Sequence, residues 1–124
     1  MTKQFIWDAV DEETFTKLLG LPEFRVVGYA IENQEDIHLY CEHCQEEALC
    51  PICGKFSKEL YKQEEQCIHD LNVAGRRTFL HVPFRSFDCD HCGTIFNEEI
   101  DSIDYERKQT KRFIAYRKRL GDIC

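Results

Sequence analysis

Two short cysteine motifs are the residues of this sequence best suited to chemistry. They read Cys50-Pro51-Ile52-Cys53-Gly54 and Cys89-Asp90-His91-Cys92-Gly93. Two residues between the thiols let one tight turn direct both sulfurs at one ion, and the following glycine permits the positive φ that closes the turn. Cys50, Cys53, Cys89 and Cys92 therefore predict a tetrahedral Zn²⁺ site. Since protein fills all four positions, the zinc would be structural, with no place for an activated water.

Other interpretations of the two motifs remain open. Four core cysteines could be paired by chance, and either motif alone could be a thioredoxin-like redox pair. The redox interpretation needs one pair beside a βαβ pattern, whereas this sequence has two matched pairs. An iron–sulfur cluster could use the same four thiolates. We favour zinc because a doubled C-x-x-C-G is among the more specific short motifs.

Each C-x-x-C-G turn is a predicted zinc knuckle, the first at 50–54 and the second at 89–93. A third cysteine pair, Cys41 and Cys44, could supply a second metal site or an alternative first knuckle. Gln45 stands where the trailing glycine would be, and Cys41 continues the apolar phase of a strand. We favour strand residues beside the main site. The other two cysteines are expected to be a core thiol, Cys67, and a terminal thiol, Cys124. We expect surface or hydrogen-bonding roles for His69, His81 and His91.

Composition limits the size and location of the protein. A chain of 124 residues is one domain, or one small domain with helical extensions, and its modest core favours a metal staple. We see no signal peptide and no apolar run long enough to span a membrane. The sequence therefore predicts a cytoplasmic protein, in which the 8 cysteines stay reduced.

Charge is distributed unevenly along the chain. The formal net charge of −7 argues against coating nucleic acid by bulk electrostatics, yet basic residues gather in the second half. A DNA-binding surface, if there is one, lies in that half. Its candidate residues are Arg76, Arg77, Arg85, Lys108, Lys111, Arg112, Arg117, Lys118 and Arg119.

The elements that must position these residues follow from periodicity and turn signals. We expect a helix over 11–20 with Phe15, Leu18 and Leu19 on one face, ended by Gly20 and Pro22. Strands at 24–31 and 37–42 form a hairpin leading into the first knuckle. Residues 58–66 are a polar segment, and 78–87 is a strand entering the second knuckle. Pro83 makes that strand an edge strand or a bulged one.

From Thr110 the pattern becomes helical, with Phe113, Ile114 and Leu120 on one side and Gly121 as the stop. The fold class is therefore α+β: a small zinc-ribbon-like antiparallel β module with flanking N- and C-terminal helices. The expected parts are a helical extension at 1–20, the zinc-binding module at 21–100 and a basic helix at 101–124.

An ordered set of motifs accompanies the two knuckles. Leu19-Gly20-Leu21-Pro22 precedes the hairpin, and His69-Asp70-Leu71, Gly75-Arg76 and Phe84-Arg85-Ser86-Phe87-Asp88-Cys89 lie between the knuckle cysteines. Phe96 follows the second knuckle, and Thr110-Lys111-Arg112-Phe113 opens the last helix. From Leu18 to about Leu120 the chain resembles the N-terminal zinc-finger region of ISL-three family insertion-sequence transposases.

The resemblance implies a role in DNA recognition. In that family this region precedes a helix-turn-helix and a metal-dependent catalytic domain, and it is taken to recognise the terminal inverted repeats of the element. The sequence up to Cys124 has no room for a second, recognition helix or for an acidic catalytic triad. We therefore expect a fragment, a truncated product or a stand-alone module that cannot transpose DNA by itself.

Two functions are weighed. The first is a zinc-binding module that recognises double-stranded DNA at transposon ends. The alternative is a zinc-stabilised protein-interaction module, with its acidic half docked on a basic partner or with two chains paired through Phe113, Ile114 and Leu120. We see no Ser/His/Asp set, phosphate loop or open metal site, so we expect neither an enzyme nor a small-molecule substrate.

Overall fold

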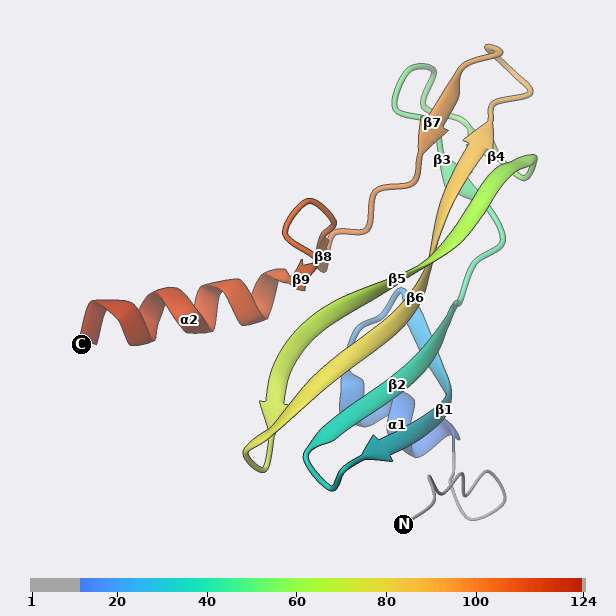
Figure 1. The fold of residues 1–124 in the computed structure, drawn as a ribbon. Coiled ribbons are helices and arrows are strands. Elements are labelled where there is room, and N and C mark those ends of the chain that lie inside the picture. Colours follow the sequence, from blue (N-terminus) through green and yellow to red (C-terminus); the bar gives the residue numbers. More distant parts are fainter. Residues whose placement is uncertain (1–11, 124) are drawn as a thin grey trace.

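The computed structural model describes residues 12–123, and their side chains as far as residue 119. Two helices flank a mainly β structure that carries a four-cysteine cluster, which confirms the mixed α+β class (Figure 1). In chain order the elements are α1 (Glu12–Leu19), β1 (Phe24–Glu32), β2 (Asp36–His43), β3 (Ala48–Leu49), β4 (Phe56–Ser57), β5 (Leu60–Val73), β6 (Arg76–Asp88), β7 (Ile95–Asn97), β8 (Ile103–Asp104), β9 (Gln109–Thr110) and α2 (Lys111–Ile123).

A long twisted hairpin, β5–β6, is the centre of the sheet. The strand order is β1-β2-β6-β5-β9-β8, with β7 added to β6, while β3 and β4 form a separate small sheet. The hairpin turns at Ala74 and Gly75, whose φ angles of 51° and 77° are the two positive values that a type I′ turn requires. At its other end lie both cysteine turns (Figure 1).

The sequence predicted an antiparallel sheet, but the sheet also contains parallel pairs. β2 pairs in parallel with β6 from Asp36↔Arg77 to Tyr40↔His81, and β9 pairs in parallel with β5 at His69↔Gln109. Parallel neighbours need a long connection, and the chain between β2 and β6 supplies one by passing through the first knuckle and β5. Pro83 lies beyond the last β2–β6 pair, so β6 is central in the sheet but unpaired with β2 where the N–H is missing.

The main core lies between α1 and one face of the sheet. Leu19, Phe24 and Leu80 are among its buried side chains, and Phe15 stacks on Tyr29 with ring centroids 5.2 Å apart. Gly20 ends α1 with a φ of 68°, as expected. The prediction for Leu18 was wrong, because that side chain is 76% exposed. A helix this short docks one narrow i, i+4 stripe, here Phe15 and Leu19.

Most of the polar segment at 58–66 is the first half of β5, a strand that the sequence analysis did not predict. Its side chains from Leu60 to Glu65 are all exposed. Because neither face of this half of the strand is buried, its sequence lacks the alternation of apolar and polar residues that predicts a strand. Pairing with β6 makes the segment a strand: partners run from Leu60↔Phe87 to Val73↔Arg76. Cys67 is likewise exposed and is not the core thiol expected, since Ile68 faces the core instead.

The C-terminal helix begins where predicted but does not stop at Gly121, because α2 continues to Ile123. One glycine in a helix costs about 1 kcal/mol, which does not by itself end the helix. Cys124 and the side chain of Leu120 lie outside what the structure describes, as does the predicted extension before Glu12. The division at residues 20 and 100 stays a prediction. No helix within residues 12–123 is long and apolar enough to cross a membrane.

Candidate metal centre

Each cysteine motif is the turn of a small β hairpin. Cys50 and Cys53 lie between β3 and β4, which pair at Ala48↔Ser57 and Leu49↔Phe56. Cys89 and Cys92 lie between β6 and β7, which pair from Ser86↔Asn97 to Asp88↔Ile95. The two hairpins come from distant parts of the sequence and meet at the end of the β5–β6 hairpin (Figure 1).

The two turns have the same backbone geometry. Cys50 N donates to Lys55 O at 2.9 Å and Gly54 N donates to Cys50 O at 2.9 Å. In the second turn, Cys89 N donates to Thr94 O at 2.9 Å and Gly93 N donates to Cys89 O at 2.8 Å. The two glycines have φ angles of 72° and 73°, in the region that only glycine enters freely. The sequence predicted this role for the glycines, and the structure confirms it.

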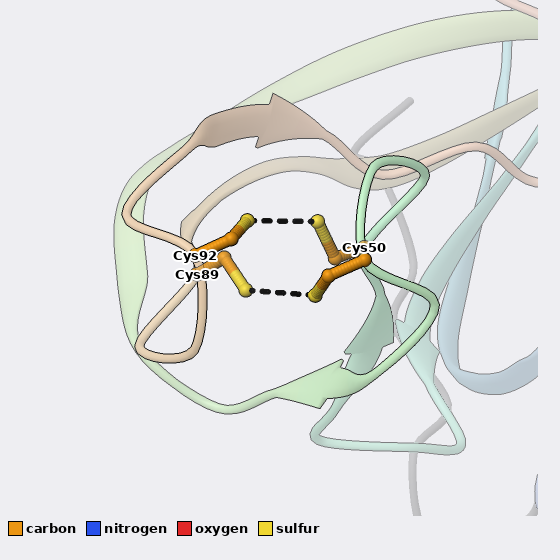
Figure 2. A group of neighbouring side chains, drawn as sticks. Cys50, Cys89 and Cys92 are labelled. Carbon is orange, nitrogen blue, oxygen red and sulfur yellow. Dashed lines mark hydrogen bonds between the residues drawn. The ribbon is translucent and has the colours of Figure 1, made fainter.

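The four sulfurs form a compact cluster in which the two turns face one another (Figure 2). Cys50 Sγ lies 3.7 Å from Cys92 Sγ, and Cys53 Sγ lies 3.6 Å from Cys89 Sγ. All four sulfurs lie within 4.8 Å of one another. Thiolates about 2.3 Å from a tetrahedral zinc would be about 3.8 Å apart, so the cluster fits Zn²⁺.

Burial and hydrogen bonding divide the four ligands into two kinds. Cys50 and Cys89 are fully buried, whereas Cys92 is exposed and Cys53 is intermediate. Hydrogen bonds from the Thr94 hydroxyl and backbone amide lower the pKa of Cys92 to about 6. At Cys53 a hydrogen bond from the Lys55 backbone lowers the pKa, but desolvation and the neighbouring thiols outweigh it and raise the pKa to about 11. A bound dication would keep all four deprotonated.

A second, smaller core is built on the ligands themselves. It contains Ala48, Cys50, Phe87, Cys89 and Phe96, with the two phenylalanine rings 5.8 Å apart. None of these residues belongs to the main core under α1. The packing of this end of the molecule therefore depends on the sulfurs being held together.

Cys41 and Cys44 are not brought to this cluster. Within residues 12–123, the group of three or more potential ligands close enough to hold one ion consists of the four knuckle cysteines. Cys41 is buried in the main core, where desolvation, with the charge of Asp70 adding, raises its pKa to about 12. Cys44 is exposed. The interpretation of Cys41 as a strand residue is the one this placement supports.

Three of the arginines proposed for DNA contact, Arg77, Arg85 and Arg112, are held in ion pairs. Arg85 is 8% exposed; its Nε and Nη2 donate to Glu98 at 2.8 and 2.6 Å, and its Nη1 donates to Gln45 O at 3.0 Å. Three nitrogens of this buried guanidinium are already hydrogen-bonded, which favours a structural role for Arg85 over the predicted DNA contact. Arg77 donates twice to Asp36 but stays exposed.

Arg112 has a third role, because it joins α2 to the β5–β6 hairpin. It donates through Nε and Nη2 to the buried carboxylate of Asp70, which also accepts from Thr110 Oγ1 at 2.6 Å. Thr110 Oγ1 in turn accepts from Phe113 N at 3.3 Å, as an N-cap does at the third helical residue. The guanidinium holds the pKa of Asp70 below its usual value despite burial, which by itself would raise it.

The remaining candidate cations are exposed, and all but Arg76 lie near or on α2. Lys108 precedes the helix in a positive-φ conformation, and its carbonyl accepts from His69 N at 2.9 Å. Arg117 lies over the Phe113 ring at 5.7 Å from its centroid. At the far turn of the hairpin, Arg76 donates to Gln34 O at 3.0 Å. The exposed candidates are thus Arg76, Arg77, Lys108, Lys111, Arg117, Lys118 and Arg119.

Sequence reasoning missed two acidic partners. Glu98, which pairs with Arg85, has no motif around it and could not have been identified. Asp70 stands in the His69-Asp70-Leu71 motif, and the pairing of that motif with Thr110-Lys111-Arg112-Phe113 was a usable signal. The two motifs are in contact in the structure. Asp70 accepts hydrogen bonds from Thr110 and Arg112, and His69 packs on Phe113 with ring centroids 4.3 Å apart.

A comparison with known protein families gives a match that covers the cysteine centre. No curated protein and no solved structure is significantly similar to this chain. The match ends at the last cysteine of the second knuckle and gives no evidence for a catalytic domain. Residues 46–92, which include all four cysteines of the cluster, match the family model described as the zinc-finger of transposase IS204/IS1001/IS1096/IS1165.

Proposed function

We propose that this protein is a cytoplasmic DNA-recognition module that binds double-stranded DNA at transposon ends through α2 and the basic residues beside it. The zinc finger holds the β5–β6 hairpin, and the hairpin holds the helix. Contacts from Lys111, Arg117 and Lys118 to phosphates would fix the position of the module on the duplex.

The observation that carries this proposal is the way α2 is attached. Its first turn is fastened by Asp70, Thr110 and the packing of Phe113 on His69. Beyond that turn the helix extends away from the sheet (Figure 1), and Arg117, Lys118 and Arg119 are exposed. A helix with a rigid base and a free basic end is suited to a groove or to a phosphate backbone.

The test compares two charge-reversed proteins with the same change in net charge. Arg117→Glu with Lys118→Glu removes cations from α2, whereas Lys17→Glu with Arg25→Glu removes exposed cations from α1 and β1. Fluorescence anisotropy would follow binding to a labelled duplex of about 30 base pairs at several salt concentrations. We expect the α2 variant to bind at least tenfold more weakly, with a smaller salt slope, and the control to lose much less.

Two results would refute the proposal: equal losses in both variants, or no binding by the wild type at low salt. Sequence preference is measured separately, by selecting bound duplexes from a randomised library. Enrichment of one motif is expected for a protein that recognises terminal repeats, and the same enriched motif should be lost in the α2 variant.

A protein-interaction role is the second candidate, and one surface favours it. Leu49, Ile52 and Phe56 are more than half exposed around the first knuckle. A cleft of about 630 Å³ is lined by Leu49 and Phe56 and by acidic residues that include Glu47 and Glu98. Pairing of two chains through Phe113 is not favoured, because Phe113 is 8% exposed. An apolar interface would be far less sensitive to salt than DNA binding.

A further inference from the structure

Two histidines of the sheet face one another on the side away from the main core. His38 of β2 and His81 of β6 flank core residues Leu39, Leu80 and Val82 in sequence, so they lie on the opposite face. Nδ1 of His38 is 2.8 Å from Nε2 of His81. Both side chains are only 16% exposed.

A carboxylate lies at the far nitrogen of each ring. Glu32 Oε2 is 3.3 Å from His38 Nε2, and Glu65 Oε2 is 3.3 Å from His81 Nδ1. The contact of His38 Nε2 lacks hydrogen-bond geometry, so this buried nitrogen has no hydrogen bond. The four side chains nevertheless form one row, Glu32–His38–His81–Glu65, that crosses the sheet.

Aromatic rings fix both imidazoles. Tyr40 stacks on His81 with centroids 4.6 Å apart, and Phe79 stacks on His38 at 5.4 Å. Since stacked rings cannot rotate freely, the facing nitrogens are held in place before any ligand arrives. Such preorganisation is what a binding site needs.

Two neutral imidazoles satisfy only part of this row. With a proton on Nδ1 of each ring, His38 donates to Nε2 of His81 and His81 donates to Glu65. Nε2 of His38 is then left with a lone pair beside Glu32 and has no hydrogen bond. A cation between the facing nitrogens takes the place of the proton that they share, which moves to Nε2 of His38 and faces Glu32.

We propose that His38 and His81 form a second metal site, which takes a divalent transition metal such as Ni²⁺ or Zn²⁺ between Nδ1 of His38 and Nε2 of His81. Imidazole nitrogen suits these ions, and water would complete the coordination. Glu32 and Glu65 then act as the carboxylates that commonly hydrogen-bond the far nitrogen of a metal-binding histidine. Two nitrogens about 2.0–2.1 Å from a tetrahedral ion are about 3.3 Å apart, so the pair must open by about 0.5 Å.

This site is independent of the cysteine centre and of DNA binding. Its ligands come from β2 and β6, and the nearest knuckle cysteine in sequence, Cys89, is the eighth residue after His81. A test must therefore fill the cysteine centre first, so that added metal reports on the histidines alone.

The experiment titrates Ni²⁺ into the full chain after it has been loaded with stoichiometric zinc. Native mass spectrometry counts the metals, and calorimetry gives the affinity. We expect one Ni²⁺ per chain in addition to the zinc, with at least tenfold weaker binding in His38→Gln and in His81→Gln. The matched control is His91→Gln, which removes an exposed imidazole from the second knuckle and should leave Ni²⁺ binding unchanged.

A measurement on the wild-type chain guards against variants that fold poorly. Paramagnetic Ni²⁺ should broaden the NMR signals of Tyr40 and Phe79, which stack on the two histidines, before those of Phe87 and Phe96 beside the cysteines. Broadening at the cysteine end alone, no second metal, or loss of binding in His91→Gln would each overturn the proposal.

Discussion

Asp70 and Arg112 join the β5–β6 hairpin to the C-terminal helix α2 through two parallel hydrogen bonds. Arg112 Nε lies 2.9 Å from Asp70 Oδ1, and Nη2 lies 2.5 Å from Oδ2. The Asp70 side chain is 4% exposed and that of Arg112 is 35% exposed. Water therefore could not replace Arg112 as the hydrogen-bond donor to this carboxylate. Asp70 thus helps to set the direction in which α2 leaves the sheet, together with its neighbour His69, which packs on Phe113.

Replacing Asp70 with Asn should loosen α2. The charge of the pair is lost, and Thr110 and Arg112 lose their common acceptor. Because Arg112 is partly solvated, we expect a cost of about 2 kcal/mol, below that of breaking a fully buried pair. Urea unfolding measures it, and hydrogen exchange should show faster amide exchange in the first turn of α2. The control, Asp36→Asn, breaks the more exposed pair with Arg77 and should cost less than about 1 kcal/mol.

Cys53→Ser should abolish stable zinc binding and unfold the end of the molecule around the knuckles. Structural zinc contributes on the order of 10 kcal/mol to small modules, and one missing thiolate opens the site. Metal counting by native mass spectrometry and thermal melting check this. Cys67→Ser, which changes an exposed thiol outside the cluster, should keep both properties. A Cys53→Ser protein with unchanged zinc content and melting temperature would contradict the ligand assignment.

Removing the metal with a chelator should loosen one end of the protein before the other. The small core of Phe87, Phe96 and the buried cysteines needs the sulfurs held together, whereas the main core under α1 contains no zinc ligand. Hydrogen exchange with and without chelator should show loss of protection in β3, β4 and β7 first. Simultaneous loss in β1 and β2 would show that the two cores unfold as one unit.

His43 should make the protein less stable in mild acid. Burial lowers its pKa, with the charge of Arg85 adding, against the opposing effects of Pro83 O, Glu98 and Glu23. The unfolded chain, in which histidine titrates near 6.5, then takes up the proton first, so stability falls as pH drops below about 6.5. The loss is at most about 1.4 kcal/mol per pH unit for one proton.

The pH measurement needs a reference, because zinc ligands also gain protons in acid. Urea unfolding of the wild type and of His43→Gln, at several pH values from about 7.5 to 5.5, supplies it. We expect the difference in stability between the two proteins to shrink as pH falls. A difference that does not change with pH would exclude His43 as the group responsible.

The cysteine centre was the part most accessible to sequence reasoning, because its chemistry is local. Cys50 and Cys53, or Cys89 and Cys92, need only a tight turn and a glycine, and both appear within five letters. The helix ending at Gly20 and the β1–β2 hairpin were predictable for the same reason. Each is set by neighbours along the chain.

What could not be predicted depends on partners far apart in sequence. Arg85 looked like a free cation, and its burial comes from Glu98 and from the carbonyl of Gln45. The exposed half of β5 is a strand because β6 pairs with it, although its own side chains show no pattern. The parallel pairing of β2 with β6 depends on the path of the long connection between the two strands. The hydrophobic periodicity of a sequence carries no information about that path.

The length of β5 has a mechanical consequence. The strand has 14 residues, begins just after the first knuckle and carries Asp70 near its other end. It therefore fixes the distance between the metal site and the helix. Adding two residues to both strands of the hairpin would increase this distance by about 7 Å, which is close to two base-pair steps of DNA. Adding one would turn Asp70 to the wrong face. The length of the hairpin therefore sets the distance between the metal site and α2.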